Sequence, residues 1–334
     1  MTYTVGGLIE ATDYNGFAST GSNNINNVWS TGTGDSGWGQ TAISNVSSAG
    51  TVTATQWATL VANLATAGQQ TSSTLTSRTQ PVAGNVIAIL ANVATDINTI
   101  TQNRGNAAAS GTTIGTFSGT TSKTTATGSG GAAWTITFTS TVTFPSANQA
   151  RYFFNAGGLA KIMFGKSSTG TDIDPDWNDL AGQCGNIFLS GYVRDAAQTI
   201  AGQSYDGVTR LGGTGGTQTT LATTTGFYDL STTPVTLFQL NNAGGPYTGG
   251  FIRVQASVNS NTTPTVLTFS TLWNEPGTAT PGATTNISGG TAVSSPATAI
   301  GAATAPTTLV NLVPPSTTYL TNSWGTPTIA ASVT

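Results

Sequence analysis

The feature that most constrains the fold is a change in hydrophobic period near residue 134. Before it, apolar residues recur at spacings of three and four, the period of a helix; after it, they alternate with Thr and Ser, the period of a strand. Residues 106–133 between them are rich in Gly, Ser, Thr and Ala. We therefore predict an α+β fold, with a small helical N-terminal unit followed by an antiparallel β-sandwich and an extended C-terminal tail.

These composition changes divide the chain into four segments. We predict a helical attachment and assembly domain over residues 1–105 and a Gly/Ser/Thr-rich linker over 106–133. A β-sandwich over 134–275 follows, and then a Pro/Thr/Gly/Ala-rich extended segment over 276–334. The last segment has too few aliphatic residues to form a core of its own, so we expect it to run along the sandwich as an edge, anchored by Tyr319, Leu320 and Trp324. Pro314 and Pro315 argue against a central strand there.

Two helices are expected in the N-terminal unit, packed on each other. Thr12 is a candidate cap for the first, which carries Tyr14 and Phe17 and leads toward Trp29. Thr53 or Thr55 caps the second, whose apolar face is formed by Trp57, Leu60, Val61 and Leu64. We expect the aromatic residues Tyr14, Trp29, Trp38 and Trp57 to form structural or interface contacts in this unit.

A third helical segment has the most regular pattern in the chain. Its apolar residues follow the alternating spacing of a coiled-coil seam: Ala83, Val86, Leu90, Val93, Ile97 and Ile100. The seam is shorter than the roughly three to four heptads typical of a coiled coil, so packing on a neighbouring helix explains it as well as self-association does. Both interpretations stay open.

Several strands are predicted after residue 134. The clearest is WTITFTSTVTF (134–144). RYFF and LAKIMFG are predicted as two strands joined by a hairpin at NAGG. Further strands are expected in NIFLSGYVRD, PVTLFQL, FIRVQASVN and TVLTFSTLW. Tyr192, Tyr205, Tyr228, Tyr247 and Trp273 are expected in or near loops, where an aromatic ring can stack on a sugar or close one end of the core.

The charge pattern disfavours two classes of partner. Only 6% of the residues are charged, and 12 acidic against 9 basic residues give a net charge of -3. Since no run of Lys or Arg could neutralise several phosphates, nucleic-acid binding is not expected. The chain has neither an apolar run of membrane-spanning length nor the pattern of a secretory signal, so we expect no membrane insertion. The single cysteine, Cys184, is predicted to be a buried apolar residue.

The stretch GDSGWGQ (34–40) resembles the surroundings of a serine-protease nucleophile. Such a serine requires a base, and the chain contains no histidine. A pair of carboxylates for glycoside hydrolysis cannot be assembled from the sequence either. We therefore predict a turn around Trp38, a protein that is not an enzyme, and no cofactor.

One acidic stretch is a weak candidate for a metal site. Asp172, Asp174 and Asp176 alternate as the first ligands of a calcium loop do. An EF-hand is excluded because Trp177 and Gln183 occupy the positions of the required Gly and Glu. A looser calcium loop stays as an alternative to a solvated turn around Pro175.

Four short motifs carry a resemblance to a known class of proteins. They are ATDYN (11–15), TGTGDSGWGQ (31–40), T-x-x-Q-W-x-x-L (53–60) and RYFFNAGG (151–158). In this order they resemble virion structural proteins of tailed bacteriophages, notably of cyanophage-type particles. Thr33 and Trp38 stand where those relatives tend to have Ser and Tyr. The resemblance covers residues 8–165, and YLTNSWGTP (319–327) is more weakly similar. It implies no catalytic residues.

The resemblance implies a part of the virion that is assembled in the host cytoplasm. We expect a fibre, or a neck/collar or baseplate-attached component, attached through residues 8–104 and assembled as a homo-oligomer, with a homotrimer favoured. Its partners would be itself and other phage virion proteins. The alternatives are a glycan-binding receptor adhesin that contacts the host surface, a capsid decoration protein, and a virion-associated hydrolase.

Overall fold

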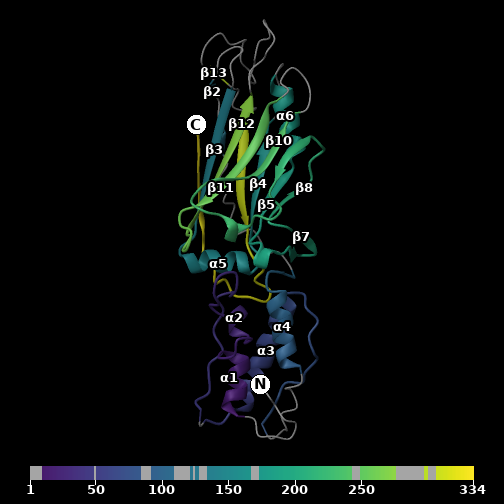
Figure 1. Ribbon diagram of the computed structural model, residues 1–334, viewed down its shortest axis with the longest axis vertical. Helices are drawn as coiled ribbons and strands as arrows, with labels where there is room; N and C mark the ends of the chain where they lie inside the picture. Colours follow the sequence, from purple (N-terminus) through teal and green to yellow (C-terminus); the bar gives the residue numbers. More distant parts are fainter. Residues whose placement is uncertain are drawn as a thin grey trace.

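The computed structural model describes residues 10–48, 50–83, 92–108, 121–122, 125–127, 134–166, 173–242, 249–275, 297–299 and 306–334. The molecule is elongated, with helices at one end and two β-sheets at the other (Figure 1). Fold class and order of the two parts are as predicted.

The helical end contains α1 (Ala11–Ala18), α2 (Asn26–Trp29), α3 (Ala54–Gln70) and α4 (Val93–Gln102). Thr53 caps α3 by accepting a hydrogen bond from the Gln56 backbone, 3.3 Å away, so Thr53 rather than Thr55 has this role. The prediction that Thr12 caps α1 is wrong, because the N-cap is Glu10, two residues earlier, and Thr12 lies inside the helix. The first and second predicted helices do pack together, with the rings of Tyr14 and Trp57 5.3 Å apart.

The structure describes the second half of the helical seam that was predicted over residues 83–100. Val93, Ile97 and Ile100 are fully buried, and α4 contacts α1 and α3 of the same chain. Val86 and Leu90 lie outside the described residues. In the described half, packing within one chain therefore accounts for the apolar pattern.

Two antiparallel sheets face each other in the sandwich. Among the described residues, one sheet has five strands and the other has eight. The first has the order β1-β14-β4-β5-β8, made of β1 (Thr121–Ser122), β14 (Thr307–Val313), β4 (Leu159–Gly165), β5 (Asn186–Leu189) and β8 (Val208–Leu211). The second has the order β13-β2-β3-β12-β11-β10-β9, with β15 also paired to β3. Its strands are β13 (Ala297–Ala299), β2 (Thr125–Thr127), β3 (Trp134–Thr143), β12 (Val266–Glu275), β11 (Phe251–Val258), β10 (Val235–Asn241), β9 (Thr217–Leu221) and β15 (Thr328–Val333). A separate hairpin joins β6 (Gln198–Ile200) to β7 (Gln203–Tyr205), and two short 3-10 helices span Val193–Asp195 and Phe227–Asp229.

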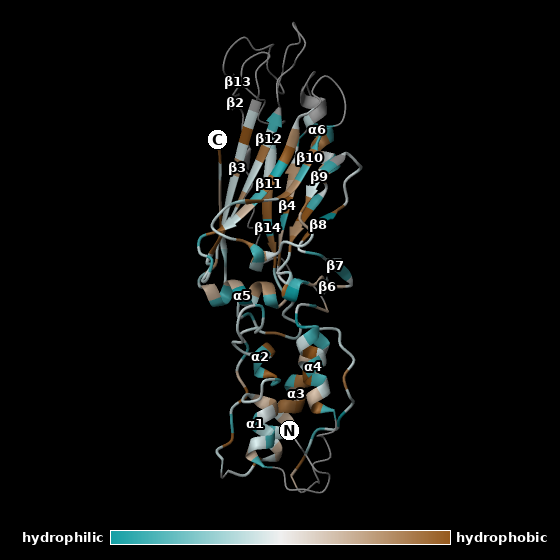
Figure 2. Cartoon of the chain, in the orientation of Figure 1, coloured by the Kyte–Doolittle hydropathy of each residue, from teal (hydrophilic) through white to brown (hydrophobic). Residues whose placement is uncertain are grey.

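The core between the sheets is centred on Trp273 of β12. Its ring lies 6.2 Å from that of Phe138, 6.5 Å from that of Phe164 and 5.9 Å from that of Trp177. Of the two roles considered for Trp273, the structure supports packing in the core, because its ring is fully buried near the end of β12. Figure 2 shows the hydrophobic segments within the strands and along the helices that face one another.

The prediction of a strand at RYFF and a hairpin at NAGG is wrong. RYFF belongs to α5 (Ala147–Asn155), which lies across the end of the sandwich nearest the helical part (Figure 1). Ser146 caps the helix, and Ala150, Phe153 and Phe154 fall at helical spacing and are buried. NAGG is the turn from α5 into β4. Aromatic residues favour strands by propensity, but burial of this helical face decided the structure.

The prediction of a solvated loop at DIDPDWND is also wrong. The stretch starts α6 (Ile173–Cys184), whose buried face consists of Trp177, Leu180, Ala181 and Cys184. Pro175 lies in the first turn, where its missing N–H has no helical partner to lose. The helix contacts β4 of one sheet and β10 and β11 of the other, so it closes the space between them.

The predicted linker and tail both contribute strands to the sandwich. β1 and β2 lie within residues 106–133, and β13, β14 and β15 lie within 276–334. β14 lies between β1 and β4, so the prediction of an edge position is wrong for this strand. The proline argument fails because β14 ends at Val313, directly before Pro314, and prolines restrict only their own positions in the ladder.

Candidate functional site

The stretch GDSGWGQ forms a tight loop that leads out of α2 and back past it. The backbone amides of Trp38, Gly39 and Gln40 donate to carbonyls of residues 28–30 over 2.8 to 2.9 Å. Gly37 has φ +99°, and a Cβ there would lie 2.2 Å from the Thr31 carbonyl oxygen, so only glycine fits. The Ser36 hydroxyl donates to the Asn27 carbonyl, which is a structural contact within the loop. The turn expected from the sequence is present.

The guanidinium of Arg151 joins this loop to the sandwich. From α5, its Nε donates to the Gly34 carbonyl at 2.8 Å, and one terminal nitrogen donates to the carbonyls of Ser36 at 2.8 Å and Thr31 at 3.2 Å. The other terminal nitrogen donates to Asn148 Oδ1 at 2.9 Å. A planar cation with five donors suits such a cluster of carbonyls, and it holds the loop against α5.

Trp38 and Asn155 form a second, buried link. The indole Nε1 of Trp38 donates to the backbone carbonyls of Asn155 at 3.0 Å and Arg104 at 3.2 Å. In return, Asn155 Nδ2 donates to the Gly37 carbonyl at 3.0 Å. The Tyr228 hydroxyl donates to Asn155 Oδ1, and burial raises the pKa of this phenol, so the hydroxyl stays protonated as a donor. Trp38 is therefore at the junction of the two parts rather than inside the helical unit alone.

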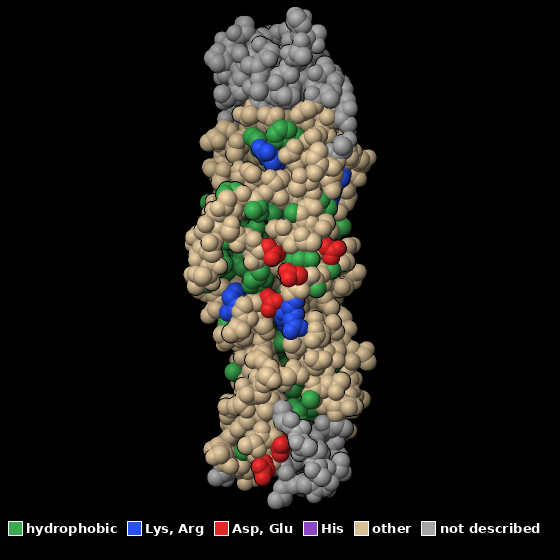
Figure 3. Space-filling view, in the orientation of Figure 1, with side chains coloured by type: hydrophobic (Ala, Val, Ile, Leu, Met, Phe, Trp, Pro, Cys, Tyr) green, Lys and Arg blue, Asp and Glu red, His purple; other side chains and the backbone are tan. Residues whose placement is uncertain are grey.

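Asp35 makes the third link, to the backbone of Arg194 in the sandwich part, and an ion pair with Arg104 of the helical part holds it in place. The charged groups of this pair are 2.5 Å apart, and the arginine side chain is 3% exposed while the aspartate is 30% exposed. Burial lowers the pKa of Arg104 and the Asp35 charge opposes that effect, so the guanidinium keeps its charge. Asp35 also accepts the Arg194 backbone amide at 2.9 Å. Figure 3 shows acidic and basic side chains gathered at this middle level of the molecule.

A segment from the far end of the sequence completes the junction. The Gln40 amide pairs with the backbone of Thr321, donating to its carbonyl at 3.0 Å and accepting its N–H at 2.9 Å. Ser323 donates to the Trp38 carbonyl, and Leu320 and Trp324 are buried beside the loop. Two of the three expected anchors are thus buried, but they reach the junction rather than a sandwich edge. Besides its bonds to Thr321, the Gln40 side-chain amide donates to the Trp38 carbonyl within the loop.

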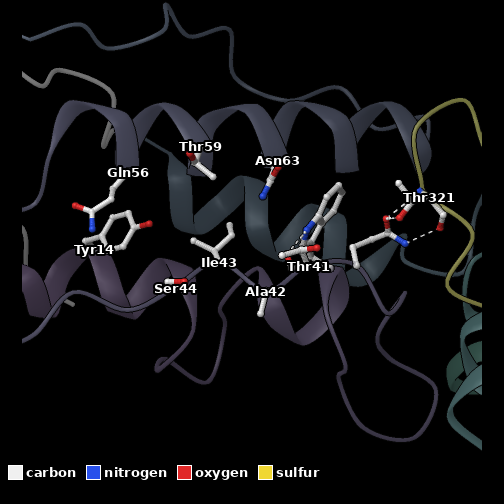
Figure 4. A pocket seen from close by; sticks show the side chains of 11 residues that line it. Tyr14, Thr41, Ala42, Ile43, Ser44, Gln56, Thr59, Asn63 and Thr321 are labelled. Atoms are coloured by element: carbon white, nitrogen blue, oxygen red, sulfur yellow. Dashed lines mark hydrogen bonds between the residues drawn. The ribbon is translucent and has the colours of Figure 1, made fainter.

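A groove of about 440 Å³ begins beside this junction and follows α3 (Figure 4). Gln56, Thr59 and Asn63 line one wall, the extended segment 40–44 lines the other, and Thr321 lies at one end. Tyr14 and Trp29 also line it but are only 1% and 8% exposed, so they offer little ring surface. Besides the exposed methyl group of Ala42, the accessible lining offers neutral amides and hydroxyls, which can donate and accept hydrogen bonds but supply no carboxylate or amine for proton transfer.

Asn side chains hold the extended wall of the groove. Asn26 exchanges two hydrogen bonds with the backbone of Ile43, at 2.8 and 2.9 Å, and Asn15 does the same with Val46, at 2.7 and 2.8 Å. Each amide replaces the partner strand that this segment lacks. The wall is therefore built without a sheet.

The candidate calcium ligands Asp174 and Asp176 belong to the first turn of α6 rather than to a loop, and the calcium site itself stays a prediction. Asp172 lies outside the described residues, as does Tyr247. Among the described residues, no group of three His, Cys, Asp or Glu side chains is placed to hold a metal ion.

The sequence interpretation missed the roles of Arg151, Asn155 and the Arg104–Asp35 pair, and it named Tyr228 as a loop aromatic without its bond to Asn155. The arginines of this set could have been singled out, because charged residues are scarce in the sequence. Of 9 basic residues in 334, Arg104, Arg151 and Arg194 all meet at the junction. Asn155 and Tyr228 carry no such signal, because their roles depend on α5 and the 3-10 helix at Phe227–Asp229 being adjacent.

The chain matches no protein-family model, no curated protein and no solved structure. Within the ranges that the structure describes, no helix has both the length and the hydropathy needed to cross a bilayer.

Proposed function

We propose that the protein is a structural component of a tailed-phage virion. It would be a fibre, or a neck/collar or baseplate-attached part, that attaches through its helical end, projects its sandwich outward and assembles as a homo-oligomer. The supporting resemblance lies in residues 11–15, 31–40, 53–60 and 151–158. A role in the virion also suits a chain whose candidate site holds parts together.

The observation that carries this proposal is the junction. The motif at 31–40 supplies the loop, and the motif at 151–158 supplies Arg151 and Asn155, which bind it. The motif at 53–60 caps α3, and Asn15 from the first motif holds the wall of the groove. Two of the four motifs that carry the resemblance therefore join the helical part to the sandwich, and the other two stabilise the helical part.

Three separate links at the junction favour a mechanical role. Arg151 binds the loop carbonyls, the Arg194 backbone amide donates to Asp35, and Gln40 pairs with Thr321 from the C-terminal segment. One cluster of buried side chains runs from Tyr14 in α1 to Trp273 in β12. Such a continuous core resists bending, as a projecting part of a particle requires.

Localisation on intact particles tests the proposal. A gold-labelled antibody against the sandwich should bind at the tail, neck or baseplate. Labelling over the whole shell would contradict this placement and support the capsid decoration alternative, and absence from particles would overturn the virion role. Mass measurement of the purified protein tests the assembly state, for which a trimer is our expectation and a strict monomer would count against a fibre.

The groove beside α3 favours one second candidate, a glycan-binding adhesin. Its amide and hydroxyl lining can bond to sugar hydroxyls, although the aromatic rings offer little surface for stacking. A glycan array should then give hits that Asn63→Ala removes, while Asn103→Ala, on α4's end and outside the groove, leaves them. A blank array at high protein concentration would remove this candidate.

A further inference from the structure

On its side away from β3, strand β15 is hydrogen-bonded to no other strand among the described residues, although β1 lies close to it, and the direction of its hydrogen bonds can be worked out. Thr334 and Thr137 exchange both backbone hydrogen bonds, each 2.9 Å long. Antiparallel pairs alternate between bonded and non-bonded positions, so Thr328, Ala330 and Ser332 also bond toward β3. The N–H and C=O groups of Ile329, Ala331 and Val333 then point away from β3. In the described part of the chain, β3 is the one strand paired with β15.

This edge lacks the devices that usually prevent strands from pairing between molecules. Thr328–Thr334 reads TIAASVT, without charge or proline, and its register with β3 is unbroken. The opposite edge of the same sheet, β9, has a register shift against β10, and the edge strand β8 of the other sheet carries Arg210. The edges at β9 and β8 therefore have features that hinder pairing with another molecule, and the β15 edge has none of those named above.

The β15 edge is also complementary to itself. With a two-fold axis at Ala331, Ile329 faces Val333 of a second copy, Ala331 faces its own counterpart, and all three outward residues form bonded pairs. Ile329, Ala331 and Val333 lie opposite Val142, Ser140 and Phe138 on the core-facing side of the sheet. Ile329 and Val333 are only partly buried, so a second strand would cover them. Shifting the axis by one residue in either direction leaves at least one outward residue unpaired.

We propose that β15 is a homotypic docking edge, on which β15 of a second copy pairs antiparallel about Ala331 and joins the two sheets. One strand pair buries less than the roughly 1,200–2,000 Å² of a stable interface, so the contact forms at high local concentration. A two-fold contact cannot close a trimer, so the β15 contact is separate from the homo-oligomer of the virion role and does not rest on it.

Cysteine cross-linking tests the register. Cys184 is the only cysteine and is buried, so Ala331→Cys adds a single accessible thiol. Under mild oxidation of concentrated protein, we expect a disulfide-linked dimer, since paired residues lie about 5.5 Å apart at Cα. Thr328→Cys is the matched control, because its two copies would be about 20 Å apart in this register at roughly 3.3 Å per residue. Failure of Ala331→Cys to cross-link, or equal cross-linking of Thr328→Cys, would overturn the proposal.

Blocking the edge tests the contact without a cross-link. Ala331→Pro removes an N–H that does not bond to β3, so the fold should persist while dimerisation in sedimentation equilibrium weakens at least ten-fold. Ala330→Pro removes a bond to β3 and should lower the melting temperature instead. Ala331→Lys supplies a second blocking variant with an unchanged backbone. Association of both Ala331 variants as strong as that of the parent protein would refute the docking edge.

Discussion

Ser36 and Trp38 lie two positions apart in the junction loop, yet their side chains have different environments. The Ser36 side chain makes one hydrogen bond at the partly exposed rim of the loop, while Trp38 is fully buried and its indole donates to two backbone carbonyls from different parts of the chain. The ring of Trp38 also lies 6.3 Å from that of Trp29 in an edge-on contact. Of these two side chains, Trp38 therefore contributes more to the stability of the fold.

Substitution of these two residues should separate their roles. We expect Trp38→Ala to lower the free energy of unfolding by about 3 to 5 kcal/mol, as loss of a buried aromatic side chain does. Ser36→Ala should cost about 1 kcal/mol or less, because a single hydrogen bond near the surface is removed. Chemical denaturation of both variants provides the measurement, and equal stability of Trp38→Ala and the parent protein would show that this placement of the ring is wrong.

Cys184 should make folding stability depend on pH above neutrality. Burial raises the pKa of its thiol to about 12, from an ordinary 9.0, while nearby Arg210 opposes the shift. The unfolded chain therefore loses this proton first, so stability present below pH 9 falls as the pH rises toward 12. Between pH 8 and pH 10.5 the loss attributable to this thiol is about 2 kcal/mol.

A Cys184→Ala variant isolates that contribution from those of the buried tyrosines. Burial also raises the pKa of Tyr14 and Tyr205, so both proteins should lose stability at high pH. The difference between parent and variant should shrink on going from pH 8 to pH 10.5 in urea denaturation. A difference that stays constant would mean that the thiol ionises as readily in the folded state as in the unfolded one.

At the scale of elements, the capping residues and apolar spacing predicted α3 correctly. For α5 and α6, the conformational preference of individual residue types led to wrong predictions. In α3, a threonine cap, a glutamine three positions later and a 3.6-residue apolar period all agree. In α5, the aromatic letters of RYFF favour a strand, but Ser146 with Gln149 marks a helix start. In α6, the acidic residues suggested a loop, although Trp177, Leu180 and Cys184 already had helical spacing. Spacing of the buried residues was the better guide.

The cap of α3 gives a paired test at this scale. Thr53→Ala removes the side-chain oxygen that accepts the Gln56 amide and should cost about 1 kcal/mol. Thr55→Ala, two positions later and exposed on the same helix, should be neutral or slightly stabilising because alanine has the higher helix propensity. Thermal melts of the two variants measure the contrast, and the reverse order would identify Thr55 as the cap.

At the scale of the whole molecule, the main feature is how two parts become one body. The helical part, the end of the sandwich and the C-terminal segment meet around one loop, and each contributes a side chain that bonds to backbone groups of another. Side-chain-to-backbone bonds of this kind fix position through geometry rather than through apolar area alone. We therefore expect the angle between the parts to be well defined in solution.

Removal of the Arg151 guanidinium should loosen that angle. Arg151→Met keeps much of the aliphatic length but loses the bonds to the carbonyls of Thr31, Gly34 and Ser36. We expect faster hydrogen exchange over residues 31–40 and a broader distance distribution in small-angle X-ray scattering. Arg253→Met removes the same charge from β11 and is the control. Identical scattering and exchange for Arg151→Met and the parent would show that this link does not hold the junction.

The sequence by itself determined the fold class, the order of the two parts, the α3 helix and the alternating strands of the sandwich. These properties are local: they depend on the period of apolar residues and on capping residues a few positions away. Only the tertiary structure decided that GDSGWGQ is the junction, that β14 enters the interior of its sheet, and that α6 closes the space between the sheets. Each of these depends on contacts between residues far apart in the chain, such as Gln40 with Thr321 and Asn155 with Gly37. A single sequence shows which groups can form hydrogen bonds but not which distant groups the fold brings to them.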